Sequence, residues 1–372
     1  MAGMLRTDRA GLRRMRVAAQ LLHRPVGAST TDVVRHLVGI QAQAPLAAEL
    51  GIRARSRRST LAEVERTRVE ERSVVRTWAM RGTIHLVSAE DVGWLVPITM
   101  EPARPTSQRR LAEEGLSAAQ AKRALRLIED MLGEEGPLTR PEIAERLRRR
   151  RIVARGQAMA HLTWLAASSG TVCFGPTRSG RPTFVLVRDW IGRPRGMDRG
   201  RALGELAARY LASHGPSLPE DLAAWSGLRA ADARRAWGLV ADRLTEVKAV
   251  GVTRWGLRGR RVQAPAGTVR LLPMFDEYLL GWRSRDLVLA QRHRQRVVPG
   301  GGMIRQAVLA DGVVRGTWSA ELRLDRLVVS IEPFARVHGA LRLALLAEAR
   351  DVARFRGLAA SEVEVAKPTV TR

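Results

Sequence analysis

Two glutamines, Gln41 and Gln43, stand one residue apart at the end of an apolar helical stretch, in LVGIQAQAPLAAEL (37 to 50). Carboxamides in such a place need hydrogen-bonding partners. A carboxamide cannot abstract a proton, so neither residue is a general base. Its carbonyl oxygen can, however, orient a water molecule or lie next to a developing positive charge. We therefore treat both glutamines as candidate reactive residues, with the small Ala42 leaving room beside them.

The proline after this pair determines how the two side chains are directed. Val33 to Ile40 form an apolar stripe that predicts a helix. Pro45 disfavours the helical conformation at Ala44 and suits the first turn of a new helix, so we expect one helix to stop near Ile40 and another to start at Pro45. In the extended segment between them, residues i and i+2 point the same way. Both carboxamides would then face one site, although capping of loose backbone groups is an alternative use for them.

The charge of the chain indicates a polyanionic partner. Its 372 residues carry a net charge of +26, with 63 basic against 37 acidic residues, and only three of the basic residues are lysines. Arginine suits bidentate contacts to phosphate. The arginines are spread over many predicted elements and do not form one basic amphipathic helix, which favours nucleic acid over an anionic membrane surface.

Other features of the composition bound the class of protein. The chain has no apolar run of about twenty residues, and MAGMLRTDRAGLRR at its start lacks the apolar core of a secretion signal. We expect a cytoplasmic, nucleoid-associated protein that does not bind a membrane. Cys173 is the only cysteine and the seven histidines are scattered, so we expect no metal and no cofactor.

Two stretches of the chain share one order of elements. Segments 134–150 and 213–228 each read Gly-Pro, a polar turn, Pro, an acidic residue and an amphipathic helix. Each is followed by a second helical pattern and then by two apolar strands with a turn. Helix, helix and basic-tipped hairpin is the order of a winged helix-turn-helix. The arginines expected in the two hairpin turns as DNA contacts are Arg178 and Arg181 in the first copy, and Arg258, Arg260 and Arg261 in the second.

These patterns predict an α+β protein with about three tandem winged-helix units. The N-terminal part fits more loosely, with helices near 9–22 and from Asp32, and alternating strands over 74–91. After residue 266, short apolar strands predict a small β-barrel or sheet, with a closing helix over about 335–357. The expected divisions are 1–120 for the first unit with the glutamine pair, 121–200 for the second, 201–265 for the third and 266–372 for the C-terminal part.

Four blocks in series resemble the AlkZ-like DNA glycosylases, a YcaQ-related winged-helix family that removes alkylated or crosslinked purines. The blocks are VVRHLVGIQAQAPLAAELGIRARS, RSVVRTWAMRGTIHLVSAEDVGWL, LLPMFDEYLLGWRSR and VLADGVVRGTW. The resemblance covers nearly the whole chain and implies tandem winged helices with a C-terminal β-barrel, C-shaped around a concave DNA channel. The signature of the family is Gln, an aliphatic residue and Gln, whereas the YcaQ branch ends in Asp. The resemblance therefore implies that Gln41 and Gln43 are catalytic. Ala42 stands where the family usually has a larger aliphatic residue.

The chemistry implied by this resemblance suits two amides. Cleavage of an N-glycosidic bond passes through an oxocarbenium-like sugar and usually needs carboxylates. A purine alkylated at N7 is already cationic and leaves without protonation, so hydrogen-bonding amides can suffice. Proton loss from the water then falls to an unassigned carboxylate or to solvent. Lyase chemistry needs an amine, and none of Lys122, Lys248 and Lys367 lies in the four blocks. We therefore expect a monofunctional glycosylase.

Further candidates surround the glutamine pair, each with a structural alternative. His85 and Asp276 are candidates for the lesion pocket, but His85 could be a bonded hairpin histidine and Asp276, like Glu277 beside it, could cap a turn. Arg76 and Arg81 flank Trp78 and could clamp phosphates, or be solvated strand residues.

The expected partner is double-stranded DNA that contains alkylated purines. Three linked units with unequal halves suit a monomer that encloses one lesion. The rival functions are a winged-helix transcriptional regulator, which would be dimeric and without catalysis, and a protein that only shields damaged DNA.

Overall fold

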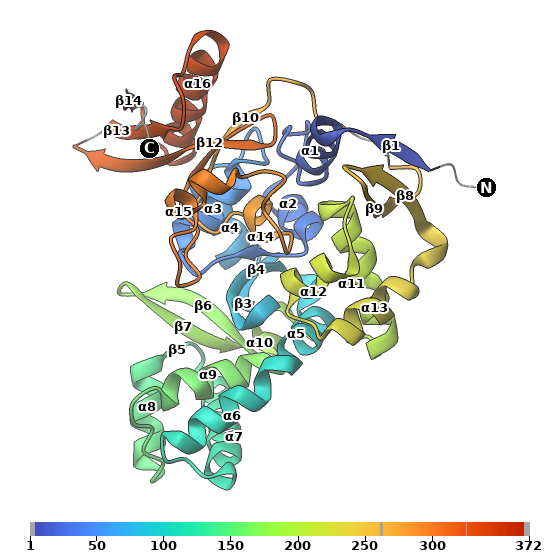
Figure 1. The fold of residues 1–372 in the computed structure, drawn as a ribbon. Coiled ribbons are helices and arrows are strands. Elements are labelled where there is room, and N and C mark those ends of the chain that lie inside the picture. Colours follow the sequence, from blue (N-terminus) through green and yellow to red (C-terminus); the bar gives the residue numbers. More distant parts are fainter. Residues whose placement is uncertain (1–3, 261–262, 325, 368–372) are drawn as a thin grey trace.

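The structure is a computed structural model that describes residues 4–260, 263–324 and 326–367. In Figure 1 a helical body lies at one end of the molecule and a sheet with a long helix lies at the other. The strand that carries Gln41 belongs to the part between them. No helix in the described residues is long and apolar enough to cross a membrane.

The first half of the chain alternates helices with short strands. Its elements are β1 (Leu5–Thr7), α1 (Arg9–Ala19), α2 (Thr30–Leu37), β2 (Ile40–Gln41), α3 (Pro45–Arg53), α4 (Leu61–Val69), β3 (Val74–Trp78), the 3₁₀ turn η1 (Met80–Gly82), β4 (Ile84–Ser88), η2 (Ala89–Asp91), α5 (Val92–Met100), η3 (Glu101–Ala103), α6 (Arg104–Glu113), α7 (Ala118–Glu135), β5 (Leu138–Thr139), α8 (Arg140–Arg149), α9 (Ala158–Ser168), β6 (Val172–Arg178), β7 (Arg181–Leu186) and α10 (Val187–Ile191).

The second half holds a third group of helices and the C-terminal sheet. Its elements are α11 (Arg199–His214), α12 (Pro219–Ser226), α13 (Ala230–Gly238), η4 (Ala241–Arg243), β8 (Leu244–Ala249), β9 (Val252–Leu257), β10 (Val269–Leu272), α14 (Glu277–Leu280), η5 (Gln291–His293), α15 (Arg294–Val297), β11 (Ala307–Ala310), β12 (Val313–Arg323), β13 (Arg326–Pro333), α16 (Gly339–Phe355) and β14 (Ala360–Val365).

One order of elements occurs three times: helix, short strand or single β-bridge, two helices and a hairpin. In the first copy β2 lies between α2 and α3 and pairs with β4; in the second, β5 lies between α7 and α8 and pairs with β7. In the third, Ser217 lies between α11 and α12 and bridges to Trp255 in β9. The short strand thus closes each hairpin by pairing with its second strand, which places Gln41 in this closing strand of the first copy.

The copies are joined by strand pairing. β2, β4, β3, β6, β7 and β5 form one six-stranded sheet in that order, because Arg76 of β3 pairs with Phe174 of β6. β1 pairs in parallel with β8. Both pairings cross boundaries expected from the sequence, and the division into units stays a prediction.

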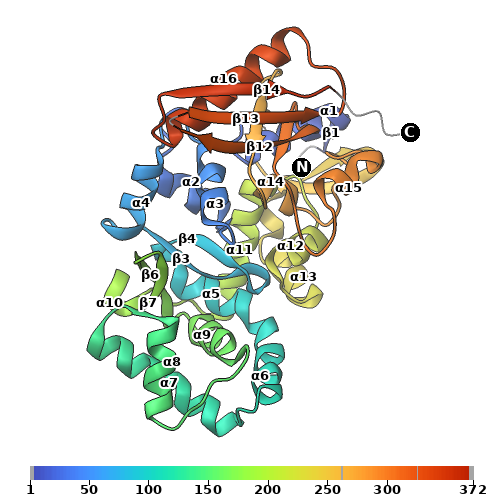
Figure 2. The same cartoon turned by 90° about the vertical axis from the view of Figure 1, so that its left-hand side faces the viewer.

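The C-terminal part forms an open sheet, so the expected β-barrel is wrong. Five strands pair in the order β10, β11, β12, β13, β14, and β10 and β14 are its two edges. β14 pairs in parallel with β13, which follows from the crossover through α16. Figure 2 shows β12, β13 and β14 running side by side with α16 along the sheet. The closing helix was expected, but the strand after it was not.

The first copy shares a hydrophobic core with each of the other parts. Val75 and Trp78 pack with the second copy, where Trp78 stacks on Phe174 at 4.6 Å. Ile40 and Ala42 belong to the core that includes the C-terminal sheet and α16. Val38 and Met80 belong to the core around α11 to α13. The residues on both sides of Gln41 are therefore fixed by packing from several directions.

Candidate active site

The glutamine pair lies where one helix has ended and the next has not begun. α2 starts with a capping box between Ser29 and Asp32 and ends at Leu37, where Val38 adopts a left-handed backbone (φ 68°). α3 starts with Pro45 as its first residue, after an extended Ala44. The break predicted from the proline is therefore confirmed, with the first helix ending slightly earlier than expected.

Gln41 is buried, with 7% of its surface exposed, and its carbonyl oxygen is held by an arginine. Arg81 Nη2 donates to Gln41 Oε1 at 2.8 Å, and Arg81 Nη1 donates to the carbonyl oxygen of Trp225. Arg81 lies in η1, between β3 and β4, with a left-handed backbone (φ 56°). A carbonyl oxygen has two lone pairs, so this bond leaves Gln41 Oε1 one further acceptor site.

A buried carboxylate holds the backbone of the same residue. Glu277 Oε1 accepts the Gln41 N–H at 2.9 Å, and Glu277 Oε2 accepts the Trp225 indole N–H at 3.0 Å. Burial raises the pKa of Glu277, while Arg81 and these two N–H donors oppose the rise. Burial lowers the pKa of Arg81, and Glu277 opposes that shift.

Gln43 lies at the surface, unlike Gln41. Its Oε1 accepts the Ile84 N–H at 3.0 Å, and the Ala42 N–H donates to the Ile84 carbonyl oxygen at 2.6 Å. The side-chain carbonyl oxygens of Gln41 and Gln43 are therefore both held by the segment 81–84, the first by Arg81 and the second by the Ile84 N–H. Ala42 is fully buried between the two glutamines along the chain. Gln43 is therefore open to solvent, whereas Gln41 is largely shielded from it.

His85 pairs with Gln41 across β2 and β4, and its side chain is fully buried. Its Nδ1 lies 2.9 Å from the carbonyl oxygen of Thr83, and its buried Nε2 has no hydrogen-bond partner. Burial, followed by the positive charge of Arg81, lowers the pKa of His85 to about 3. The imidazole is thus neutral at neutral pH and cannot serve as a general acid there.

Asp276 has a structural role in this geometry. Arg55 donates to both of its oxygens at 2.8 Å, and neither side chain has any exposed surface. Asp276 also caps α14 by accepting the Tyr278 N–H at 2.8 Å. Its oxygens are committed to these partners, so a lesion would have to displace Arg55 to reach them.

The sequence did not predict the roles of Glu277 and Trp225 at the glutamine pair. Glu277 stands 236 residues from Gln41 along the chain. One signal pointed to it: a second acidic residue follows Asp276 inside the apolar MFDEYLL, and a buried carboxylate needs donors. Among the described residues, no group of three or more His, Cys, Asp or Glu could hold a metal ion.

Comparison with known proteins identifies the family of this chain. The model of the family described as DNA glycosylase AlkZ-like matches residues 34–355, which include both glutamines, Arg81 and Glu277. The chain belongs to the AlkZ-like DNA glycosylase family. The resemblance inferred from the four sequence blocks is confirmed, and a transcriptional regulator is not favoured.

Similarity to a curated protein and to a solved structure extends the match over almost the entire chain. The Interstrand DNA cross-link repair glycosylase of Streptomyces sahachiroi is 31% identical over 371 residues, covering 94% of this chain and 97% of the relative. The solved structure of the DNA glycosylase AlkZ from the same organism has a TM-score of 0.84 and 28% identity, covering 97% of this chain and 100% of that chain. The α+β fold is therefore that of an AlkZ-like glycosylase.

The arginines expected to contact DNA in this glycosylase fall into three situations. Arg178 and Arg181 pair with each other at the tip of the β6–β7 hairpin, as expected, and Arg178 also bonds Glu142 of α8. Arg76 is half-buried; it stacks on Phe174 at 4.6 Å and donates to the Ala42 carbonyl oxygen at 3.3 Å. Arg81 has both terminal nitrogens bound inside the protein, to Gln41 and Trp225, so its fork is turned toward the glutamine site.

The expected position of the arginines in the third hairpin is wrong. The β8–β9 turn consists of Val250 and Gly251, and β9 ends at Leu257. Arg258 and Arg260 therefore follow the hairpin, where Arg260 Nη1 donates to the Ala212 carbonyl oxygen at 2.6 Å. Arg261 lies outside the described residues. The strands are shorter than the apolar pattern indicated, because Val250–Gly251 supplies a two-residue turn.

Proposed function

We propose that this DNA glycosylase is monofunctional and hydrolyses the N-glycosidic bond of cationic N7-alkylpurines. The observation that supports this most is the use of Glu277, whose carboxylate bonds the backbone of Gln41. Glu277 has no exposed surface, and its two oxygens accept N–H groups of Gln41 and Trp225. It is not placed to protonate a leaving base, so the site suits a base that leaves without protonation.

In the proposed reaction the two amides act on water and on the sugar. The oxygen of water bonds to the anomeric carbon while the bond to the purine nitrogen breaks. The electrons of that bond neutralise the cationic purine, and the proton of water leaves to solvent. Gln43, at the surface, orients the water or the lesion, and the free acceptor site of Gln41 Oε1 lies toward the developing oxocarbenium charge.

The relative from Streptomyces sahachiroi carries interstrand crosslink repair in its name. We extend the proposed substrates to bulky and crosslinked N7-alkylpurines on that ground, in base excision repair or in self-resistance to a genotoxin. A cationic and weakly stacked base is also less costly to expose from a duplex. Exposure of Gln43 at the end of a strand is compatible with a large adduct.

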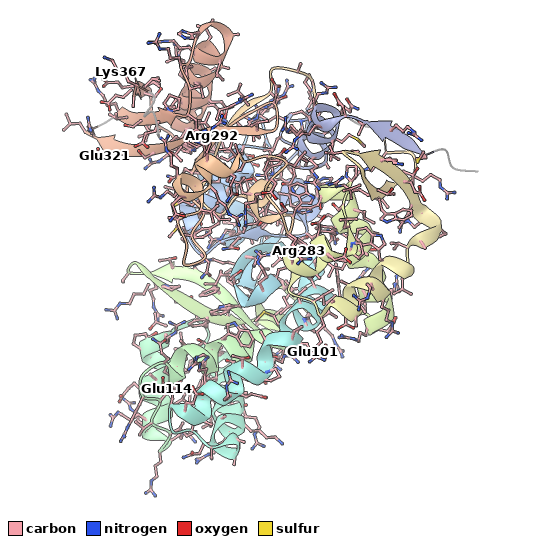
Figure 3. The ribbon with its side chains drawn as sticks, in the orientation of Figure 1. Glu101, Glu114, Arg283, Arg292, Glu321 and Lys367 are labelled. Atoms are coloured by element: carbon pink, nitrogen blue, oxygen red, sulfur yellow. The ribbon has the colours of Figure 1, made fainter. Side chains whose placement is uncertain are left out.

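The absence of lyase activity is supported by where the lysines lie. Lys122, Lys248 and Lys367 are exposed, on α7, on β8 and after β14. Figure 3 shows Lys367 at the end of the molecule that carries the C-terminal sheet. None of the three bonds a residue of the glutamine site, so no amine is placed there for a Schiff base.

We further propose a monomer that binds double-stranded DNA in the cytoplasm, associated with the nucleoid. The three copies of the helix–strand–helix–helix–hairpin order support three winged-helix units, which would lie in a C-shape around DNA. The net charge of +26 supports a polyanionic partner. Arg76, Arg178 and Arg181 are its proposed phosphate contacts.

The test is excision from a duplex that bears a single N7-methylguanine. We expect the wild-type protein to release free base and leave an alkali-labile abasic site, and Gln41→Ala and Gln43→Ala to bind the duplex without release. Borohydride should trap no protein–DNA adduct. Binding without release by the wild type, or a trapped adduct, would contradict the proposal.

A further inference from the structure

The edge strand β2 is held from its open side by a residue of the C-terminal part. β2 is the first strand of the six-stranded sheet, so only one of its sides pairs, with β4. Ala42 N–H points toward that partner and bonds Ile84, whereas Gln41 N–H points away from it and bonds Glu277. Glu277 thereby satisfies a backbone donor that the sheet leaves unpaired.

Glu277 is itself held in place by the first and third copies. Glu277 is the first residue of α14. Asp276, directly before it, accepts hydrogen bonds from Arg55 at 2.8 Å on both carboxylate oxygens. Trp225 of α12 holds the second oxygen of Glu277 at 3.0 Å. Three separate parts of the chain therefore meet at one carboxylate.

Arg81 completes a closed ring of hydrogen bonds. Gln41 bonds Glu277 through its backbone and Arg81 through its side chain, while Trp225 bonds Glu277 through its indole and Arg81 through its carbonyl oxygen. Gly227 permits the close approach of α12, because a Cβ there would lie 2.9 Å from the Arg81 backbone nitrogen. The ring fixes both the backbone and the carboxamide of Gln41.

We propose that Glu277 is a positioning residue for glycosidic-bond hydrolysis, acting through Gln41. The inference rests on the proposed function of Gln41. Glu277 fixes where β2 lies at Gln41 and supplies the negative charge that balances Arg81 in a buried site. Without that charge, a guanidinium next to Gln41 Oε1 would oppose the positive charge that develops on the sugar.

A purely structural carboxylate offers a matched control within the same part of the chain. Glu348 of α16 is also buried; it accepts the Leu271 N–H at 3.0 Å and pairs with Arg53 at 3.0 Å. It has no bond to the glutamine motif. Glu348→Gln should therefore destabilise the fold without changing the chemical step.

The experiment measures single-turnover release of N7-methylguanine at saturating enzyme, together with the Kd for the lesion duplex and the melting temperature. For Glu277→Gln we expect the rate constant to fall by about ten- to a hundredfold, with Kd within about twofold, because orientation and not binding is lost. Glu348→Gln should keep the wild-type rate constant. A wild-type rate constant in Glu277→Gln, or equal losses in both variants, would overturn the inference.

Two further variants separate the possible failures. If Glu277→Gln does not fold, Trp225→Phe removes the donor to the second carboxylate oxygen and keeps an aromatic ring in the core. A rate loss of about threefold or more supports the inference, and an unchanged rate constant overturns it. Loss of release in Gln41→Ala with full release in Glu277→Gln would refute the role of Glu277 alone. No release by the wild type would refute the proposed function.

Discussion

Arg81→Lys separates two roles that the sequence left open for this residue. Lysine keeps the positive charge that balances Glu277, but it lacks the planar fork that reaches Gln41 Oε1 and the Trp225 carbonyl oxygen together. If Arg81 positions Gln41, the chemical step should slow. If Arg81 clamps a phosphate, binding should change and the chemical step should not.

The size of the effect follows from the bond that is lost. A hydrogen bond from a charged donor contributes about 1.5–3 kcal/mol. The Arg81–Gln41 bond is 2.8 Å long, with Gln41 buried and Arg81 partly buried, so solvent replaces it only in part. If half or more of this energy acts in the transition state, the single-turnover rate constant should fall by about three- to a hundredfold.

The assay pairs single-turnover release with the salt dependence of the Kd for lesion DNA. The slope of log K against log salt should be unchanged in Arg81→Lys and in Arg81→Met. In Arg181→Gln, at the tip of the β6–β7 hairpin, it should flatten by about 0.9, the loss of one phosphate contact. A flatter slope in Arg81→Met with an unchanged rate constant in Arg81→Lys would refute the positioning role.

Two predictions concern stability near the glutamine pair. Arg55→Met leaves the fully buried Asp276 without its partner and should lower the free energy of unfolding by about 3–5 kcal/mol, measured by calorimetry. The double variant Arg55→Met/Asp276→Asn should recover part of this loss. Equal losses in the single and double variants would contradict the pairing. Burial lowers the pKa of His85 from 6.5 to about 3, so between these values the unfolded chain binds a proton that the folded chain does not. As a result, protonation of His85 in the unfolded chain should lower the free energy of unfolding by about 1.4 kcal/mol for each pH unit between pH 6.5 and about 3, and should have no effect above pH 6.5. Urea titrations at several pH values should show a smaller acid loss in His85→Gln than in the wild type, and identical pH profiles would contradict the assignment.

Local patterns predicted the elements around the site well. Pro45 predicted the break between α2 and α3, and the order of Gly-Pro, polar turn, Pro and acidic residue in segment 134–150 predicted the helix α8. These features depend on neighbours within a few residues. The hairpin tip with Arg178 and Arg181 was predictable for the same reason, since Ser179 and Gly180 favour a turn.

Features that depend on distant contacts were not predictable from the sequence alone. The barrel was expected because short apolar strands look alike in barrels and in open sheets. A barrel would require β10 to pair with β14, whereas here these two strands are the edges of the sheet. From the sequence, Arg81 was expected either to clamp a phosphate or to be a solvated arginine on a strand. Its partners, Gln41 and Trp225, lie 40 and 144 residues away, and no local pattern connects them.

In the proposed reaction, neutral amides suffice because the departing base carries a positive charge. The most direct measurement compares single-turnover release of N7-methylguanine with release of hypoxanthine, a neutral purine, from otherwise identical duplexes, each corrected for the uncatalysed rate. We predict release of N7-methylguanine and no release of hypoxanthine above background at any pH near neutrality. Release of hypoxanthine at a comparable rate would show that the site protonates its leaving group, and would contradict the account.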